Sequence, residues 1–225
     1  LDTGFHVTTP DAQDVQCYLA KIVDAGLTHV VLETTSHGWA QHRVDASEFD
    51  IGVVTNITHE HMDEHGNYVN YRAAKARLFE SLEKTHTKPQ GNPRLAVINR
   101  DDQSFDFLND FIKTQKLNYG LQADADVRAE NVTYSPSGIR FTAASKDFRV
   151  DVTSKLVGAY NVSNCLAALT AAVGGASVAV YEKFFAAWDV LLTPVMTRLP
   201  PRVGELAPDL PFETQYERAS TLVGF

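Results

Sequence analysis

The chain has 225 residues, of which 44% are hydrophobic, and its formal net charge at pH 7 is −8. This length can bury a hydrophobic core in one large domain or two small ones. The acidic balance argues against a general nucleic-acid binder and against a protein of anionic membrane surfaces, because both need a basic patch. Cys17 and Cys165 lie far apart without metal-ligand spacing, and no apolar run is long enough to span a bilayer. We therefore expect a reduced, cytoplasmic protein.

The first elements that the pattern predicts are a helix and a buried strand. The helix begins after Pro10, where Asp11 can act as the N-cap, and it ends at Gly26. Residues 28–33, Thr-His-Val-Val-Leu-Glu, form an apolar run bounded by polar residues. Such a run is typical of a buried strand in a parallel sheet. This predicted strand ends on a carboxylate, Glu33.

Strands and helices then alternate along the chain. A turn and a short helix carrying Gln41 and Arg43 precede a second predicted strand at residues 49–56. A helix is predicted over residues 68–84, and a third strand over residues 95–99. This repetition predicts an α/β fold with a doubly wound, mostly parallel sheet, whose ligands bind beyond the carboxyl ends of the strands.

Polar residues follow each of these predicted strands. Glu33 ends the first, Asn56 and a His-rich loop follow the second, and Asn99, Asp101 and Asp102 follow the third. The carboxyl ends of parallel strands share one edge of a sheet, so these side chains are candidates for a common site. The alternative for the two aspartates is that they cap the next helix.

The second half of the sequence has a different texture. Residues 127–132, 138–143 and 148–152 predict short strands joined by turns, an antiparallel excursion at the edge of the sheet. Helices are predicted over residues 162–173 and 178–192. The tail after Thr193 is rich in proline and lacks periodicity.

The stretch from Val54 to Phe79 carries the strongest chemical signal, because a loop with three His and three carboxylates feeds a helix that bears Lys75. Glu33, His61 and Lys75 come from adjacent strand–helix junctions and could converge above the sheet. Mg²⁺ prefers oxygen ligands such as Glu33, whereas a protonated Lys cannot ligate a metal. In the alternative interpretation, which spacing alone leaves open, Lys75 is a surface charge, His61 a loop residue and Glu33 a turn cap.

Three motifs resemble the central domain of the Mur ligase family. Residues 55–66 read Thr-Asn-Ile-Thr-His-Glu-His-Met-Asp-Glu-His-Gly, and residues 71–79 read Tyr-Arg-Ala-Ala-Lys-Ala-Arg-Leu-Phe. Residues 33–43, Glu-Thr-Thr-Ser-His-Gly-Trp-Ala-Gln-His-Arg, resemble the version found in UDP-N-acetylmuramoyl-tripeptide synthetases. Those enzymes add the third residue of the peptidoglycan stem peptide. The sequence departs from the family pattern at Glu60, where Asp is usual.

The resemblance implies that Glu33 and His61 bind Mg²⁺ and that CO₂ carbamylates Lys75. Carbamylation would replace an ammonium with an anionic oxygen donor suited to Mg²⁺. These three residues are accordingly our catalytic and metal-binding candidates.

The resemblance also implies two binding sites. The residues expected to hold the UDP-N-acetylmuramoyl-peptide are Thr8, Thr9, Ser36, Gln41 and Arg43. The residues expected near ATP are Asn99, Asp102 and Asn161. For Thr9 the alternative is a helix-start residue, and for Arg43 a surface charge.

As a whole, the resemblance implies an ATP-dependent ligase of peptidoglycan precursor synthesis. Such an enzyme phosphorylates the terminal carboxylate of UDP-N-acetylmuramoyl-dipeptide, and the amino group of an amino acid then attacks the acyl phosphate. Its cofactors are Mg²⁺ and ATP, and its partners are the UDP-sugar peptide and the amino acid, with no nucleic acid or membrane.

The domain organisation that we expect is partial. Residues 1–175 are a Mur ligase central domain, and residues 176–225 are its end and a divergent tail. The UDP-binding and C-terminal domains are expected to be absent, and the phosphate loop Gly-x-x-x-x-Gly-Lys-Ser/Thr does not occur in the sequence. We therefore expect the isolated chain to be inactive. The alternative is a non-catalytic remnant that binds a nucleotide-sugar or a protein partner.

Overall fold

The structure is a computed structural model that describes residues 8–57, 68–88 and 92–175. The chain divides into two units, of which Thr9–Ala187 contains every described helix and strand. Of the other unit, Leu1–Thr8 with Trp188–Phe225, only Thr8 is described. The predicted helix over residues 178–192 and the proline-rich tail lie outside the described residues.

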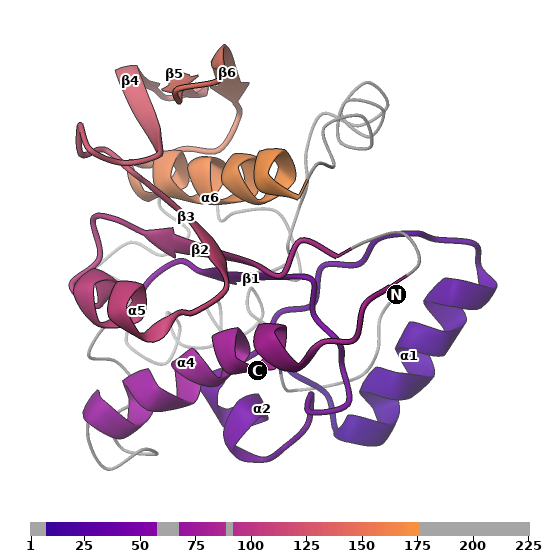
Figure 1. Ribbon diagram of the computed structural model, residues 1–225. Helices are drawn as coiled ribbons and strands as arrows, with labels where there is room; N and C mark the ends of the chain where they lie inside the picture. Colours follow the sequence, from indigo (N-terminus) through magenta and orange to yellow (C-terminus); the bar gives the residue numbers. More distant parts are fainter. Residues whose placement is uncertain (1–7, 58–67, 89–91, 176–225) are drawn as a thin grey trace, which may run out of the picture. The chain divides into compact units, whose positions relative to one another are not determined.

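The described strands form one sheet whose spatial order follows the chain (Figure 1). They are β1 (Ile51–Val54), β2 (Leu95–Asn99), β3 (Gln115–Gly120), β4 (Val127–Ser135), β5 (Gly138–Ala144) and β6 (Arg149–Ser154). The pairs from β1 to β4 are parallel, and β4, β5 and β6 pair antiparallel. The predicted mostly parallel α/β sheet with an antiparallel excursion is confirmed.

Helices cover both faces of the sheet (Figure 1). The described helices are α1 (Ala12–Asp24), α2 (Ser36–Ala40), α4 (Tyr68–Lys84), α5 (Phe105–Phe111) and α6 (Tyr160–Gly174). Because side chains alternate along a strand, Leu95 and Val97 of β2 pack in the core that contains α6, whereas Ala96 and Ile98 pack in the core that contains α4 and α5. The apolar run of β2 is therefore what a strand buried on both faces requires.

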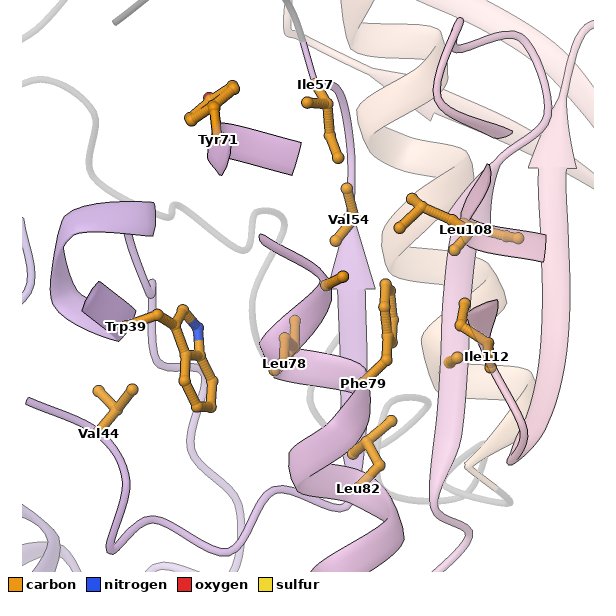
Figure 2. Packing of buried hydrophobic residues seen from close by; sticks show 13 residues of the cluster. Trp39, Val44, Val54, Ile57, Tyr71, Leu78, Phe79, Leu82, Leu108 and Ile112 are labelled. Carbon is orange, nitrogen blue, oxygen red and sulfur yellow. The ribbon is translucent and has the colours of Figure 1, made fainter. Parts of the chain in front are cut away.

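The core beneath α4 positions the candidate site. Leu78, Phe79 and Leu82 of α4 are buried against Val54 of β1 (Figure 2). Trp39 of α2 joins the same core. This packing fixes both α2 and α4 relative to the carboxyl end of β1.

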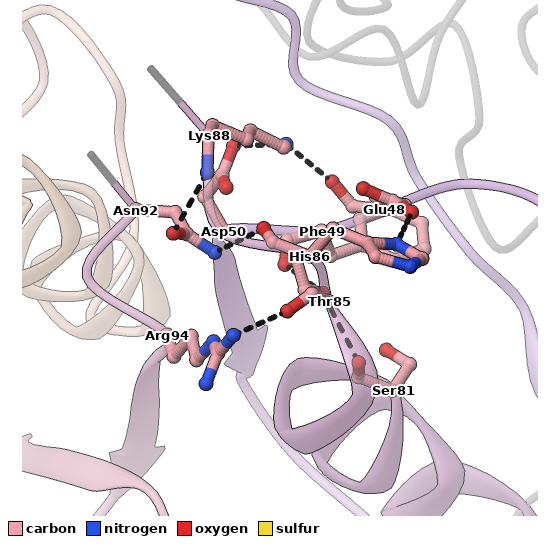
Figure 3. A network of polar contacts seen from close by, with 9 residues as sticks. All are labelled: Glu48, Phe49, Asp50, Ser81, Thr85, His86, Lys88, Asn92 and Arg94. Atoms are coloured by element: carbon pink, nitrogen blue, oxygen red, sulfur yellow. Dashed lines mark hydrogen bonds and ion pairs between the residues drawn. The ribbon is translucent and has the colours of Figure 1, made fainter. Parts of the chain in front are cut away.

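A polar network closes the opposite, amino-terminal ends of β1 and β2 (Figure 3). Lys88 Nζ donates to the carbonyl of Glu48 and to Asp50 Oδ2, both at 2.7 Å. His86 hydrogen-bonds the Glu48 carboxylate, and this bond is the main cause that lowers the pKa of Glu48. Arg94 Nη2 donates to the Thr85 carbonyl at 2.5 Å. These contacts hold the α4–β2 connection away from the edge where ligands of such sheets bind.

The predicted strand at residues 28–33 is wrong. The segment has no regular secondary structure, and Val30 and Val31 are 50% and 62% exposed. A strand is stabilised by hydrogen bonds to a neighbouring strand, and within the described part of the chain β1 pairs only with β2. An apolar run in the sequence indicates that residues are buried, but it does not supply the neighbouring strand that a β-strand needs for its hydrogen bonds. The opposite error concerns β3, which the sequence did not predict because its first residues, Gln115 and Lys116, are polar.

Two glycines with positive φ allow a test of backbone strain. Gly26 (φ 73°) ends α1 in a Schellman motif, where the Leu27 N–H donates to the Ile22 carbonyl, and a Cβ at this position would meet nothing within 4 Å. Gly138 (φ 138°) begins β5, and a Cβ there would clash with the carbonyl of Ser154.

We expect Gly138→Ala to lower the free energy of unfolding by about 3 kcal/mol, since it combines strain with a backbone clash. Gly26→Ala is the matched control and should cost only about 1 kcal/mol, the strain alone. Urea denaturation of both variants measures the difference. Equal losses would show that the clash at Ser154 is relieved without cost.

Candidate functional site

The carboxyl ends of β1 and β2 meet through Asn99. Its Nδ2 donates to the Thr55 carbonyl at 2.9 Å and to Asn56 Oδ1 at 3.2 Å. Asn99 is only 6% exposed, so burial adds to the cost of breaking these bonds. The predicted convergence of Asn56 and Asn99 at one edge of the sheet is therefore seen in the structure.

Asp102 lies at the same carboxyl ends of β1 and β2 as Asn56 and Asn99, and we call these three residues the Asn99 cluster. The Asp102 carboxylate accepts backbone hydrogen bonds. Its Oδ2 accepts from the Ile57 N–H at 3.2 Å, and its Oδ1 accepts from the Ser104 N–H at 2.9 Å. Asp101 Oδ2 accepts from the Leu121 N–H at 2.6 Å. Both carboxylates thus order the loops around the ends of β1 to β3. These bonds go to loop amides, whereas the N-cap of the next helix, α5, is Ser104 and makes no side-chain cap hydrogen bond. An ATP-binding role for Asp102 stays a prediction.

The start of α6 reaches the same strand ends. Ser163 Oγ lies 3.5 Å from Asn99 Nδ2. Asn161 Nδ2 donates to the Val157 carbonyl at 2.7 Å, and its Oδ1 accepts from Asn164 at 3.2 Å. Asn161 therefore organises the first turn of α6, beside the Asn99 cluster.

Tyr119 and Ser163 are residues next to this cluster that the sequence reasoning missed. Tyr119 is fully buried at the end of β3, and its burial raises the pKa of its phenol above the ordinary value. The Ser163 hydroxyl opposes this rise, and the Asp102 and Asp101 carboxylates add to it. The phenol therefore stays protonated at neutral pH. Its position at the end of β3, directly before Gly120, would have been the sequence signal if this strand had been predicted.

Glu33 and Lys75 come from distant parts of the chain and interact electrostatically. Lys75 lies on α4 and is partly buried, and this burial lowers the pKa of its amine. The Glu33 carboxylate partly offsets that change. Lys75 Nζ also lies 5.6 Å from the centre of the Tyr71 ring. Lys75 is therefore more shielded from solvent than a fully exposed surface charge, and His61 lies outside the described residues.

This environment suits the modification of Lys75. Only a neutral amine has the lone pair that attacks CO₂, and a lowered pKa increases the neutral fraction at a given pH. The carbamate would be an anionic oxygen donor next to the Glu33 carboxylate. Like charges repel unless a cation neutralises them, so an anionic donor at Lys75 that interacts electrostatically with Glu33 would favour a hard divalent ion such as Mg²⁺. Within residues 8–57, 68–88 and 92–175, no group of three His, Cys, Asp or Glu side chains could hold a metal.

Four of the predicted substrate-binding residues gather around α2. Thr9 Oγ1 donates to the Glu33 carbonyl at 3.2 Å and accepts from the Thr35 N–H at 2.9 Å. Arg43 Nη1 donates to the Thr9 carbonyl at 2.6 Å, and its Nε donates to Gln41 Oε1 at 2.8 Å. Thr9, Gln41 and Arg43 thus bind one another and brace the turn that carries Glu33.

Ser36 and Thr8 complete the predicted set. Ser36 is buried at the first position of α2, and the Thr35 hydroxyl caps this helix by accepting from the Gly38 N–H at 3.0 Å. Gly38 is required here because a Cβ would lie 2.9 Å from Thr9 Cγ2. Thr8 is exposed and belongs to the other unit.

A profile described as the Mur ligase middle domain matches residues 3–172 of the chain. The chain belongs to the Mur ligase family. The sequence of this Mur ligase middle domain is 41% identical over 168 residues to the UDP-N-acetylmuramoyl-L-alanyl-D-glutamate--2,6-diaminopimelate ligase of Geobacter sulfurreducens, covering 74% of the chain and 32% of that relative. It is 40% identical over 171 residues to the UDP-N-acetylmuramyl-tripeptide synthetase of a Roseiflexus species, covering 73% of the chain and 34% of the relative.

A solved structure of a UDP-N-acetylmuramoyl-L-alanyl-D-glutamate--2,6-diaminopimelate ligase superposes with a TM-score of 0.67 and 30% sequence identity. The match covers 86% of the chain and 39% of that structure. The predicted Mur ligase family is confirmed, and the predicted similarity to a UDP-N-acetylmuramyl-tripeptide synthetase is found in the second relative. The Mur ligase middle domain described here spans about a third of the length of the curated relatives that it matches.

Proposed function

We propose that this chain supplies the ATP-dependent middle domain of a ligase that adds an amino acid to UDP-N-acetylmuramoyl-dipeptide. The observation that carries the proposal is the partly buried Lys75, whose amine has a lowered pKa and interacts electrostatically with the Glu33 carboxylate, because such a lysine is suited to carbamylation. The similarity to ligases and synthetases of UDP-N-acetylmuramoyl peptides supports the substrate class.

In this proposal Glu33, the carbamate of Lys75 and His61 hold Mg²⁺. The ion supplies positive charge that stabilises the phosphoryl group during transfer. The role of the chain is to fix the donors: Thr9 holds the Glu33 backbone, and the packing of α4 holds Lys75.

ATP is proposed to bind beyond the carboxyl ends of β1 and β2, with Asn99, Asp102 and Asn161 as nucleotide-side residues. The hydrogen bonds from Asn99 and to Asp102 order the loops at this edge, which is where parallel sheets bind nucleotides. Transfer of the γ-phosphoryl group to the substrate carboxylate gives an acyl phosphate and ADP. Attack of the incoming amine then forms the amide bond and releases phosphate.

The UDP-sugar peptide is proposed to bind at Thr8, Thr9, Ser36, Gln41 and Arg43. Arg43 presents a planar guanidinium that suits a carboxylate or diphosphate. Its present contacts with Thr9 and Gln41 would orient that group toward a ligand.

The domain boundaries are also proposals. We assign residues 1–175 to the middle domain and residues 176–225 to its end and a divergent tail. The described helices include none that is long and apolar enough to cross a membrane. A cytoplasmic location is proposed because the substrates are soluble nucleotides.

A carbamate on Lys75 is the first expected outcome. In ¹³C-bicarbonate at mildly alkaline pH, ¹³C NMR should show a carbamate resonance that Lys75→Met removes. Lys84→Met is the matched control, since Lys84 lies exposed on the same helix, and it should keep the resonance. A signal that survives in Lys75→Met would contradict the modification at this site.

The ligase activity has its own test. Because the phosphate-loop motif does not occur in the sequence, we expect the isolated chain to release no ADP with ATP, UDP-N-acetylmuramoyl-dipeptide and an amino acid. The complete natural protein that contains the chain should release ADP only when the dipeptide substrate is present. No substrate-dependent ADP release from that protein would favour the non-catalytic alternative, a remnant that binds a nucleotide-sugar or a protein partner.

A further inference from the structure

A hydrogen bond from Arg77 joins α4 to α2, and the proposed function does not use it. Arg77 Nη1 donates to the carbonyl oxygen of Trp39 at 2.9 Å. Trp39 lies in the last turn of α2, where helix carbonyls lack partners within the helix and need others. The same carbonyl accepts from the His42 N–H at 3.2 Å, at the start of the turn that leads to Arg43.

The Trp39 side chain ties α2 to α4 a second time. Its indole is buried in the core shared with Leu78 and Phe79 (Figure 2), and its ring centre lies 5.8 Å from that of Phe49. The buried indole packs α2 against α4, but an apolar contact does not set the orientation of the backbone carbonyls of α2. The directional bond from Arg77 to the Trp39 carbonyl restricts that orientation.

The two helices carry the two halves of the proposed site. Ser36 opens α2, and Gln41 and Arg43 follow its end, where the UDP-sugar peptide is proposed to bind. Lys75 lies on α4 only two residues before Arg77. Contact between α2 and α4 therefore sets where the substrate lies relative to the proposed metal site.

From this geometry we infer that Arg77 is a positioning residue, which holds the substrate-binding turn at a fixed place relative to Lys75. The inference rests on the proposed function. Transfer of a phosphoryl group needs the reacting atoms about 3 to 3.5 Å apart, and a displacement of about 1 Å costs on the order of 100-fold in rate. Arg77 therefore acts through α2 without contacting the substrate.

Hydrogen exchange tests the structural half of this inference in the chain itself. Arg77→Met keeps an apolar side chain of similar length and removes the donor. Loss of a charge-assisted hydrogen bond is worth at least about 1.5 kcal/mol, so the amides of Gln41 and Arg43, which bond to the α2 carbonyls of His37 and Gly38, should exchange about tenfold faster.

Arg94→Met is the matched control. Arg94 also donates from its guanidinium to a backbone carbonyl, that of Thr85, but does so in the network beyond the other end of α4. Its loss should leave exchange at residues 38–43 unchanged. Equal acceleration in both variants, or none in Arg77→Met, would overturn the inference.

Steady-state kinetics of the complete natural protein tests the functional half. Arg77→Met should raise KM for UDP-N-acetylmuramoyl-dipeptide about tenfold and lower kcat, while KM for ATP stays at the wild-type value. Arg77→Lys keeps a positive charge but loses the planar guanidinium, so its KM for UDP-N-acetylmuramoyl-dipeptide should lie between the wild-type value and that of Arg77→Met. A purely structural role would lower the amount of active enzyme without this selective change in KM.

Arg43→Ala separates failure of this inference from failure of the proposed function. If Arg43→Ala raises KM for the dipeptide substrate and Arg77→Met does not, the positioning role alone is refuted. If Arg43→Ala leaves that KM unchanged, the assignment of the substrate-binding turn fails. If the wild-type protein shows no ligation at all, the proposed function fails, and hydrogen exchange alone decides whether Arg77 holds α2.

Discussion

Lys75→Met is expected to abolish ligation and at the same time to stabilise the fold. Without the amine no carbamate can form, so the proposed Mg²⁺ site loses an anionic donor next to Glu33. Metal stabilisation of a phosphoryl group is worth several kcal/mol, and at about 1.4 kcal/mol per factor of ten the loss in kcat should be about a thousandfold. Turnover of the complete natural protein, measured as ADP released per enzyme, gives the result.

The stability gain follows from the electrostatics of Lys75. Burial lowers the pKa of its amine, so the folded state resists protonation where an unfolded lysine, with a pKa of about 10.4, still binds a proton. Between the lowered pKa and the unfolded value the unfolded state holds more protons, and the free energy of unfolding rises as the pH rises. Below that window the buried cation destabilises the fold. Lys75→Met removes the destabilisation by the buried cation and the rise of the free energy of unfolding with pH. Thermal denaturation in CO₂-free buffer, at pH values below and within the window between the two pKa values, should show both changes.

Lys84→Met serves as the control for both measurements. Lys84 is exposed at the end of the same helix, so its replacement should change neither turnover nor the pH slope of stability. If Lys75→Met retained more than about a tenth of the wild-type kcat, a carbamate ligand at this position would be excluded, because its contribution would be below about 1.4 kcal/mol.

Phe79→Ala is expected to cause a large loss of stability. Phe79 is 1% exposed and lies in the core with Val54, Leu108 and Ile112, between α4, the sheet and the α5 region (Figure 2). Removing a buried Phe side chain costs about 3 to 5 kcal/mol, from lost transfer free energy and the cavity left behind. The total free energy of unfolding of a domain of this size is about 5 to 15 kcal/mol, so the substitution would remove a substantial part of its stability.

The measurement is urea denaturation followed by circular dichroism. Val69→Ala is the matched control, since Val69 lies on the same helix but is 61% exposed, and it should cost less than about 0.5 kcal/mol. A loss below about 1.5 kcal/mol for Phe79→Ala would mean that the core collapses around the smaller side chain and that α4 is held mainly by other contacts, such as those of Trp39.

Local signals explain which parts of the fold were predictable. The helix over residues 68–84 and the strand over residues 95–99 were predicted with the bounds that the structure gives, because helical spacing and an uninterrupted apolar run report burial directly. Gly26 ended α1 as expected, since its left-handed conformation is a local property. The strand at residues 28–33 failed because strand formation depends on a partner that local composition cannot supply.

In the candidate site, too, some features follow from the sequence and others depend on the tertiary structure. The sequence by itself determined that Asn99 and Asp102 stand at the carboxyl end of β2, because the order of strands and helices places them there. Glu33 was singled out from a predicted strand that does not form. Only the tertiary structure decided that Lys75 is partly buried and interacts electrostatically with Glu33. It also decided that Thr9 and Arg43 brace the turn that carries Glu33, and that Arg77 holds the Trp39 carbonyl. The physical reason is that a pKa shift or a hydrogen bond depends on the few ångströms between groups from distant segments, and packing of α2 and α4 sets those distances.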